Sequence, residues 1–219
     1  MTQELANPQR FRFGKNWSQF IDAHFTAERL ATAQQHLLDF LKLPDLAGRR
    51  FLDIGCGSGL HSLAAWDAGA AEVVSFDLDP DSVATTERLR QKVGNPDNWT
   101  VCQGSVLDPA FVANLPRSDI VYSWGVLHHT GAMWDAVAAA ASTLAEDGVF
   151  YLALYCSDVY IDPTPEFWLR VKRRYNEANP LRKRWMEWRY AWLFTIKPAL
   201  RQRRNPFADI FAYRTRGMS

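Results

Sequence analysis

The stretch Phe51–Ala65, FLDIGCGSGLHSLAA, decides the fold of this chain. It begins as a short apolar run and passes through Asp53 into a turn that holds Gly55, Gly57 and Gly59. Glycines in such a turn let a ligand touch the backbone, and the N-terminus of the following helix presents unpaired N–H groups to an anion. The stretch therefore predicts a ligand-binding turn between a buried strand and a helix.

Strands and helices alternate outward from this turn. The pattern predicts strands at RRFLDI (49–54), EVVSFD (72–77), WTVCQG (99–104), DIVYSW (119–124) and VFYLALYC (149–156). It predicts helices over 27–41, capped by Thr26, over 59–68, over 80–93, capped by Asp79, and over 132–146, ending at Asp147-Gly148. Near-continuous apolar strands separated by helices indicate an α/β fold: a doubly wound, mainly parallel Rossmann-like sheet with helices on both faces.

The composition is that of a globular protein, and the low cysteine count favours a reducing compartment of the cell. Of 219 residues, 47% are hydrophobic and 22% charged, which excludes disordered and fibrous classes. Three cysteines cannot form a complete disulfide framework, the N-terminus has no apolar signal region, and VFYLALYC is too short to span a bilayer. We expect a cytoplasmic protein with no transmembrane segment.

The net charge of +1 hides a split along the chain. Residues 1–169 hold 11 Lys and Arg against 21 Asp and Glu, whereas residues 170–219 hold 14 against three and are rich in aromatic side chains. A basic, aromatic segment suits nucleic acid, anionic lipid headgroups or phosphorylated small substrates. The plainer interpretation is a set of amphipathic helices whose aromatic side chains pack on the main domain.

An acidic residue at the end of the second predicted strand limits which ligands the turn could bind. Asp77 stands 18 residues past Gly59, where its carboxylate could accept both hydroxyls of a ribose. A dinucleotide-binding turn reads G-x-G-x-x-G/A, with a small residue at position 60. Leu60 stands there instead, which argues against NAD.

Successive motifs carry a resemblance to a known family. FLDIGCGSGLHSLAA, VVSFDLDP, CQGSVLD and DIVYSWGVLHH resemble, in order and spacing over about residues 50–155, the motifs of class I S-adenosylmethionine-dependent methyltransferases. Arg10–Trp17, RFRFGKNW, and Ser123–Gly131, SWGVLHHTG, are similar to a bacterial subgroup that often accompanies glycan or natural-product genes.

The resemblance implies roles for individual residues. Asp53 and the turn from Gly55 to Gly59 would hold the methionine moiety of the cofactor, Asp77 the ribose, and Leu78 one face of the adenine. Ser105 would flank the adenine edge, where many family members have Asp, and Trp17 would close over the cofactor. The full set of expected cofactor residues is Asp53, Gly55, Cys56, Gly57, Ser58, Gly59, Asp77, Leu78, Gly104, Ser105, Val106, Ser123, Trp124 and Trp17.

Methyl transfer needs alignment of the nucleophile with the methyl group, and a base only where the acceptor must lose a proton. His129 and His128, after the fourth strand, are the candidate bases. The alternative is that they only hydrogen-bond the next helix N-terminus.

Some relatives bind a metal through E-x-x-E-H in this loop. Gly125–His129 lacks both acids, so we predict no metal. Cys56 is expected to be a spacer, and Tyr122 to lie in the core.

The expected organisation has three parts: an N-terminal arm over 1–48, a cofactor-binding core over 49–156 and a basic, aromatic helical lid over 157–219. Nothing after residue 156 has the pattern of the sixth and seventh strands of the family's sheet, whereas 166–178, 181–196 and a stretch near 207–213 read as helices. We therefore expect a truncated chain, or an edge of the fifth strand covered by the lid or a partner.

The expected activity is methyl transfer from S-adenosylmethionine to oxygen or nitrogen of a small-molecule, glycan or natural-product acceptor, anionic in view of the basic segment. The alternatives are an RNA or protein methyltransferase and a non-catalytic cofactor-binding fragment. We do not expect nucleic acid as the partner, although the basic segment leaves it open, and a homodimer also stays open.

Overall fold

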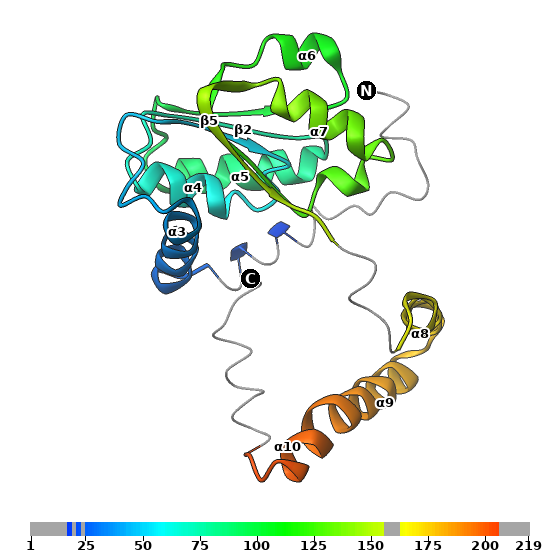
Figure 1. Ribbon diagram of the computed structural model, residues 1–219. Coiled ribbons are helices and arrows are strands. Elements are labelled where there is room, and N and C mark those ends of the chain that lie inside the picture. The colour runs from blue at the N-terminus through cyan, green and yellow to red at the C-terminus, as the bar shows by residue number, and fades with distance from the viewer. Residues whose placement is uncertain (1–16, 19–20, 23–24, 156–162, 206–219) are drawn as a thin grey trace. The chain divides into compact units, whose positions relative to one another are not determined.

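A computed structural model describes residues 17–18, 21–22, 25–155 and 163–205 of the chain (Figure 1). The chain divides into two compact units, Met1–Tyr155 and Cys156–Ser219. The first is called the core unit below and the second the helical unit. The motif residues Arg10–Asn16, Cys156 and the helix expected near 207–213 lie outside the described residues. The three-part division and the lid stay predictions.

The core unit is built on one parallel sheet with the strand order β3-β2-β1-β4-β5. Its strands are β1 (Arg50–Ile54), β2 (Glu72–Asp77), β3 (Trp99–Gln103), β4 (Ser118–Trp124) and β5 (Leu144–Ala153). The order reverses between β1 and β4, and in such sheets ligands bind beyond the carboxyl ends of the strands at that reversal. The predicted fold class is confirmed.

Helices cover both faces of the sheet (Figure 1). On one face lie α3 (Ala27–Leu41), α4 (Leu60–Asp67) and α5 (Pro80–Lys92), which bury Leu37, Leu63 and Leu89. On the other lie α6 (Pro109–Ala113) and α7 (Met133–Ala141), with Ala136 and Ala140 fully buried. Alternate residues of each strand feed the two cores, as Phe51 and Leu52 of β1 do.

The predicted caps are confirmed. Thr26 accepts a hydrogen bond from the Arg29 N–H at 3.2 Å, and Asp79 accepts one from the Asp81 N–H at 3.0 Å. Such a side-chain oxygen satisfies one of the N–H groups that the first turn of a helix leaves open. Both helices therefore begin at the predicted residues.

Two predicted boundaries are wrong. The helix expected over 132–146 ends at Ala141, and β5 runs from Leu144 to Ala153 rather than over 149–156. The Ser142 and Thr143 hydroxyls donate to the carbonyls of Ala139 and Ala140, which marks the end of α7. A bulge then separates the pair Ser118–Leu144 from Ile120–Val149, with Asp147 at φ 62°.

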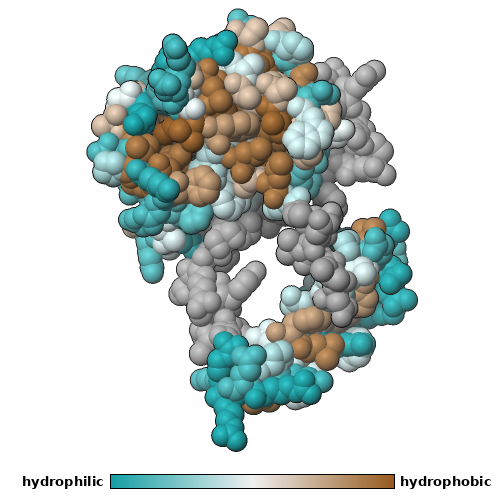
Figure 2. All heavy atoms as spheres, viewed as in Figure 1, coloured by the Kyte–Doolittle hydropathy of each residue, from teal (hydrophilic) through white to brown (hydrophobic). Residues whose placement is uncertain are grey.

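β5 is an edge of the described sheet. Its residues are mostly half-buried, and Val149 is 45% exposed. Figure 2 shows hydrophobic side chains gathered on the core unit in this view. Within the described ranges 25–155 and 163–205, β5 is the last strand along the chain, as the sequence predicted.

The helical unit holds α8 (Pro165–Glu177), α9 (Pro180–Ala191), a π-helical turn over Trp192–Ile196 and α10 (Lys197–Arg201). Thr164 and Asn179 cap the first two helices, each followed by a proline at the first helical position. This agrees with the helices expected over 166–178 and 181–196. No helix among the described residues is long and apolar enough to cross a membrane.

Candidate active site

The glycine turn joins the carboxyl end of β1 to α4. Gly55, Gly57 and Gly59 have φ angles of 78°, 54° and 77°, in the left-handed region that favours glycine. A Cβ on Gly55 would lie 2.5 Å from the Val126 side chain, and one on Gly59 would lie 2.8 Å from the Thr86 side chain. Backbone angle and close packing together require glycine at these positions.

Asp77, at the end of β2, fastens the turn. One carboxylate oxygen accepts a hydrogen bond from the Gly57 N–H at 3.1 Å, and the other accepts one from the Asp79 N–H at 2.8 Å. The side chain is only half-buried. The structure thus brings the two predicted features, the glycine turn and the acid, into direct contact.

Asp53 lies behind the turn and ends a chain of buried hydrogen bonds that the sequence did not reveal. The Trp99 indole N–H donates to Ser75 Oγ at 2.9 Å, Ser75 Oγ donates to Ser62 Oγ at 2.8 Å, and Ser62 Oγ donates to Asp53 Oδ2. All four side chains are at most 2% exposed. We call these four residues the Asp53 relay.

Burial raises the pKa of Asp53 to about 7, because a carboxylate loses solvation when it leaves water. The hydrogen bond from Ser62 acts in the opposite direction, and the negative charge of Asp77 raises the pKa further. Two neighbouring carboxylates of this kind favour a ligand that carries positive charge.

The N-terminal segment reaches the turn through Trp17. A Cβ on Gly57 would lie 3.0 Å from the Trp17 indole nitrogen, so the ring lies directly against the turn. Arg88 of α5 anchors this segment, since it donates to Ser18 Oγ at 2.8 Å and lies 3.5 Å from the Asp22 carboxylate. The structure thus brings Trp17 to the glycine turn, and the expectation that its ring closes over the cofactor stays a prediction.

The residues expected around the adenine lie near the ends of β2 and β3. The Gly104 N–H donates to the Asp77 carbonyl at 3.1 Å, and Leu78 is half-buried. Ser105 Oγ accepts from the Leu107 N–H at 3.1 Å, while Val106 joins the core beneath α7. Their roles toward an adenine stay predictions.

Ser123 and Trp124 end β4 beside the turn. Ser123 is fully buried, and its hydroxyl donates to the Ile54 carbonyl at 3.1 Å, which ties β4 to β1. Trp124 is 37% exposed, with the rings of His36 and His61 at 5.6 and 6.2 Å. That the two residues border the methyl group stays a prediction.

His36 and His61 were not singled out from the sequence. They belong to α3 and α4, and no local motif connects them. Burial, with a smaller contribution from His36, lowers the pKa of His61 to about 4, so its imidazole is neutral at pH 7. Tyr122 is 2% exposed in the core beside His61, as predicted.

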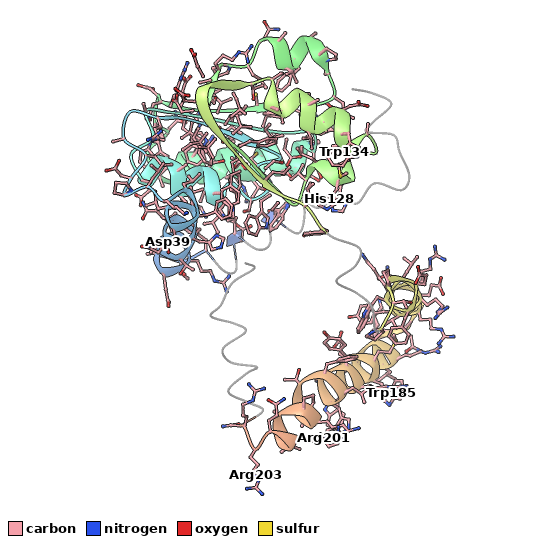
Figure 3. All side chains as sticks on the ribbon, viewed as in Figure 1. Asp39, His128, Trp134, Trp185, Arg201 and Arg203 are labelled. Atoms are coloured by element: carbon pink, nitrogen blue, oxygen red, sulfur yellow. The ribbon has the colours of Figure 1, made fainter. Side chains whose placement is uncertain are left out.

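The candidate bases lie in the short 3-10 helix η1 (Leu127–His129) after β4, at the end of the sheet (Figure 3). The ring centroids of His128 and His129 are 4.0 Å apart, and the Tyr155 ring lies 4.6 Å from His128. Burial lowers the pKa of both histidines, so each is a neutral base at pH 7. Tyr155 was missed because it lies within the apolar run predicted as the fifth strand and belongs to no motif.

The ring nitrogens of His128 have no hydrogen-bond partner within the residues that the structure describes. The prediction that this histidine only caps the next helix is therefore not supported by a contact of its side chain. Both nitrogens are also buried, so proton exchange with a substrate requires that the residues covering them move aside.

Ser58 and Cys56, the remaining predicted residues of the turn, make hydrogen bonds within the protein, and their roles toward a cofactor stay predictions. Ser58 Oγ accepts from the Leu60 N–H at 3.4 Å. Cys56 Sγ accepts from Thr86 Oγ1 at 3.3 Å, and burial raises the pKa of the Cys56 thiol. Cys102 is half-buried, with its pKa also raised by burial. Among the described side chains, no three His, Cys, Asp or Glu gather where a metal ion could be held.

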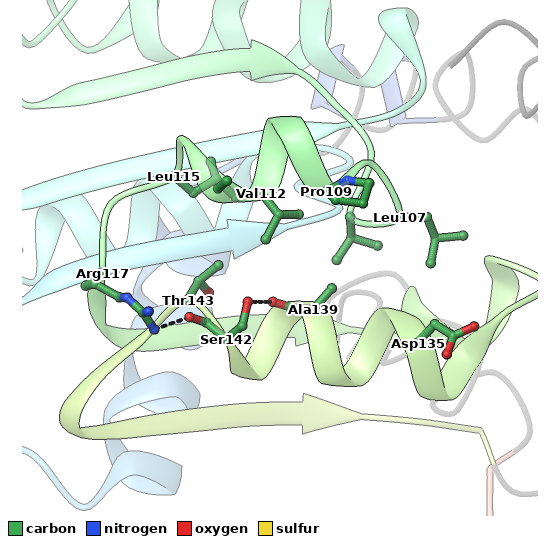
Figure 4. A pocket seen from close by; sticks show the side chains of 11 residues that line it. Leu107, Pro109, Val112, Leu115, Arg117, Asp135, Ala139, Ser142 and Thr143 are labelled. Carbon is green, nitrogen blue, oxygen red and sulfur yellow. Dashed lines mark hydrogen bonds between the residues drawn. The ribbon is translucent and has the colours of Figure 1, made fainter.

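A hollow of about 420 Å³ lies elsewhere, between α6 and α7 (Figure 4). Val112, Leu115 and Ala139 line it, and Arg117 spans its rim by donating to the carbonyls of Ser142 and Leu144. It lies on the sheet face opposite α4 and away from the glycine turn. Val106, which is expected to flank the adenine, also lines this hollow, so the hollow adjoins the predicted cofactor residues at that end.

The residues at the turn fit S-adenosylmethionine. Asp53 and Asp77 offer carboxylates to an ammonium group and a ribose diol, and α4 begins at Gly59 without a side-chain cap, which leaves N–H groups for a carboxylate. The Trp17 ring supplies an aromatic wall against the same turn.

Comparison with known proteins identifies the class. The model of the methyltransferase domain family matches residues 23–208, so the chain belongs to that family. A solved structure from Methanococcus maripaludis, described as an S-adenosyl-L-methionine-dependent methyltransferase, aligns with a TM-score of 0.56 over 83% of this chain and 85% of that chain at 16% identity. The core unit thus has the class I fold of enzymes that use S-adenosylmethionine.

Two relatives with higher sequence identity than this structure are named for the molecules that they modify. The chain is 30% identical over 149 residues to the ribosomal protein L11 methyltransferase of Vibrio parahaemolyticus, covering 63% of this chain and 48% of the relative. It is 33% identical over 110 residues to the tRNA U34 carboxymethyltransferase of Saccharophagus degradans, covering 50% and 33%. The chain therefore spans about half or less of the length of these relatives.

Proposed function

We propose that this protein is an S-adenosylmethionine-dependent methyltransferase whose cofactor lies against the turn between β1 and α4. The observation that carries the proposal is the pair of hydrogen bonds that fastens Asp77 to the Gly57 and Asp79 N–H groups, with Trp17 against Gly57. Together they hold a carboxylate, a glycine turn and an aromatic ring around one position at the reversal of strand order.

Each residue has a distinct task in the proposed mechanism. Asp77 holds the ribose hydroxyls, Asp53 faces the ammonium group from behind the turn, and Trp17 excludes water. Leu78, Gly104, Ser105 and Val106 surround the adenine, while Ser123 and Trp124 border the reacting end. When bound, S-adenosylmethionine supplies an electrophilic methyl group on a sulfonium. The chain itself contributes alignment, which lowers the barrier by several kcal/mol.

The proton of the acceptor goes to a histidine in this proposal. His129 and His128 both have lowered pKa values and are neutral at pH 7, so either imidazole can accept a proton from an oxygen or nitrogen acceptor. Tyr155, with its ring against His128, fixes the orientation of that imidazole.

For the acceptor we propose a small molecule or glycan with an anionic group, since residues 163–205 carry 12 Lys and Arg against three Asp and Glu. The names of the relatives favour a second candidate, a protein or RNA acceptor. A salt-sensitive affinity for RNA, with a slope set by the phosphate contacts, would distinguish the two.

The first experiment is calorimetric titration of the 219-residue chain with S-adenosylmethionine, S-adenosylhomocysteine and NAD. We expect micromolar binding of both sulfur compounds and none of NAD. Asp77→Ala should weaken S-adenosylhomocysteine at least about tenfold, the loss expected for hydrogen bonds to a charged group. Asp77→Asn, which keeps an oxygen for the Gly57 N–H, controls for damage to the turn. Equal affinity of the wild type and Asp77→Ala would overturn this placement of the ribose.

A further inference from the structure

One face of α9 packs against α8 within the helical unit. The Trp168 ring of α8 lies 6.0 Å from the Tyr190 ring and 5.4 Å from the Phe194 ring. Tyr175 of α8 donates its hydroxyl hydrogen to Glu187 of α9. Residues 187, 190 and 194 follow the helical period, so this side of α9 is already occupied.

A second apolar face, formed by α9 and the first residue of the π-helical turn that follows it, points away from these contacts. Its members follow the spacing i, i+4, i+7 and i+11 and form one line along the helix. They are Leu181, Trp185, Trp188 and Trp192, which are 83%, 60%, 67% and 42% exposed. We call these four residues the tryptophan stripe; Figure 3 labels Trp185 within it. A hollow of about 290 Å³ lies between its three indoles and Arg189.

Arginines border the stripe on both sides. Arg184 precedes Trp185 and Arg189 follows Trp188, and at 100° per residue these two positions fall on opposite flanks of the line. Residues 163–205 hold 12 Lys and Arg against three Asp and Glu, so the unit is strongly basic. Figure 2 shows hydrophobic and strongly hydrophilic side chains next to one another along it.

We propose that the tryptophan stripe docks α9 flat on the surface of an anionic lipid bilayer. Tryptophan rings favour the headgroup level, apolar side chains enter the acyl boundary, and arginines on the flanks reach lipid phosphates. The stripe covers 12 residues, about 18 Å at 1.5 Å per residue, which suits a helix lying along the interface and is too short to span it.

Two observations favour a bilayer over single-stranded nucleic acid. The Arg189 guanidinium lies over one face of the Trp185 ring at 5.6 Å, so that face of this ring is not open to a stacked base. Leu181 and Leu200 are 83% and 56% exposed, and leucine side chains contribute to burial in hydrocarbon but not to base stacking. A bilayer uses both the leucines and the tryptophans.

The test is flotation of the full chain with vesicles. We expect binding to phosphatidylcholine vesicles that contain about one third phosphatidylglycerol, and at least about tenfold weaker binding to phosphatidylcholine alone, since several arginines each add attraction to an anionic surface. Trp185→Ser with Trp188→Ser should reduce binding to the anionic vesicles about tenfold or more. Binding that does not depend on phosphatidylglycerol or on these two residues overturns the proposal.

The chain offers a matched control for the variant. Trp134 of α7 is 71% exposed but lies in the core unit, so Trp134→Ser should leave vesicle binding unchanged. Leu181→Ser is a milder second variant that keeps every indole and should weaken binding severalfold. The far-ultraviolet circular dichroism of both variants should match the wild type, because the stripe lies outside the contacts between α8 and α9.

A uridine oligonucleotide provides the competing arm. Binding of that RNA with no vesicle binding overturns the proposal in favour of nucleic acid. Binding of neither also overturns it. The proposal does not depend on the methyltransferase site, and cofactor titration of the same samples reports separately on that site.

Discussion

At the scale of single residues, Asp53 is the most informative side chain of the site. Its carboxylate is 2% exposed, and its pKa is raised to about 7 by burial. A folded-state pKa above the unfolded value of 3.8 means that the native state binds the proton more tightly. The free energy of unfolding therefore falls as pH rises from about 4 to about 7.

Asp53→Asn should remove this dependence. Between about pH 4 and pH 7 the wild type should lose up to about 4 kcal/mol relative to the variant, the limit set by the pKa difference. Urea unfolding of both proteins across this range measures the effect, and the difference between them cancels the titration of other groups. Parallel stability curves would show that the carboxylate is charged in the folded protein throughout.

Ser62→Ala tests the Asp53 relay at the residue that donates directly to the carboxylate. The variant removes the hydrogen bond that lowers the pKa of Asp53 and leaves a buried carboxylate without that donor. We expect a loss of about 1–3 kcal/mol at pH 8, where Asp53 is charged, and a smaller loss at pH 5. Ser82→Ala, at a serine that is 2% exposed in α5, is the control and should cost the same at both pH values. Equal losses for Ser62→Ala at the two pH values would contradict the relay.

At the scale of elements, the glycine turn can be separated into backbone and packing effects. Gly48 and Gly59 have nearly the same φ, 74° and 77°, but a Cβ at Gly48 meets nothing within 4 Å, whereas one at Gly59 lies 2.8 Å from Thr86. Gly48→Ala should therefore cost about 1–2 kcal/mol, and Gly59→Ala distinctly more, because it displaces α4 from α5. Thermal unfolding measures both. Similar losses would mean that Thr86 yields without cost.

Most helices and strands could be predicted, because helix caps and apolar strand runs are encoded in a few neighbouring residues. Thr26 and Asp79 cap helices at the predicted residues, and EVVSFD over 72–77 is β2 without change. The boundary after Ala141 was wrong because pairing of Leu144 with Ser118, distant in sequence, overrides the helical preference of the alanine-rich run.

The candidate site also has one part that could be predicted from the sequence and one part that could not. Asp77, the turn and Trp17 lie in recognisable motifs, and the structure brings them together. The Asp53 relay could not be predicted, because Ser62, Ser75 and Trp99 come from α4, β2 and β3 and meet only when the sheet forms. Tyr155 and His36 belong to no motif, and their contacts with His128 and Trp124 form only in the folded chain.

At the scale of the whole molecule, the two units differ in what holds them together. Both hydrophobic cores of the sheet lie within residues 21–154. The helical unit buries little: among the described residues of α8 to α10, only Ala199 is fully buried. The core unit should therefore fold without the helical unit.

A chain that ends after Tyr155 tests this. We expect cooperative unfolding with a midpoint within a few degrees of the full chain, and unchanged affinity for S-adenosylhomocysteine, because the glycine turn, Asp77 and the Asp53 relay are all retained. A chain that ends after Trp124 is the matched control. It loses α7 and β5, which pairs with β4 from Ile120 to Trp124 and buries Tyr151, so it should not fold cooperatively. A fragment that folds after Tyr155 but binds S-adenosylhomocysteine much more weakly than the full chain would assign part of the cofactor site to the helical unit. That outcome would also favour the lid role predicted for residues 157–219.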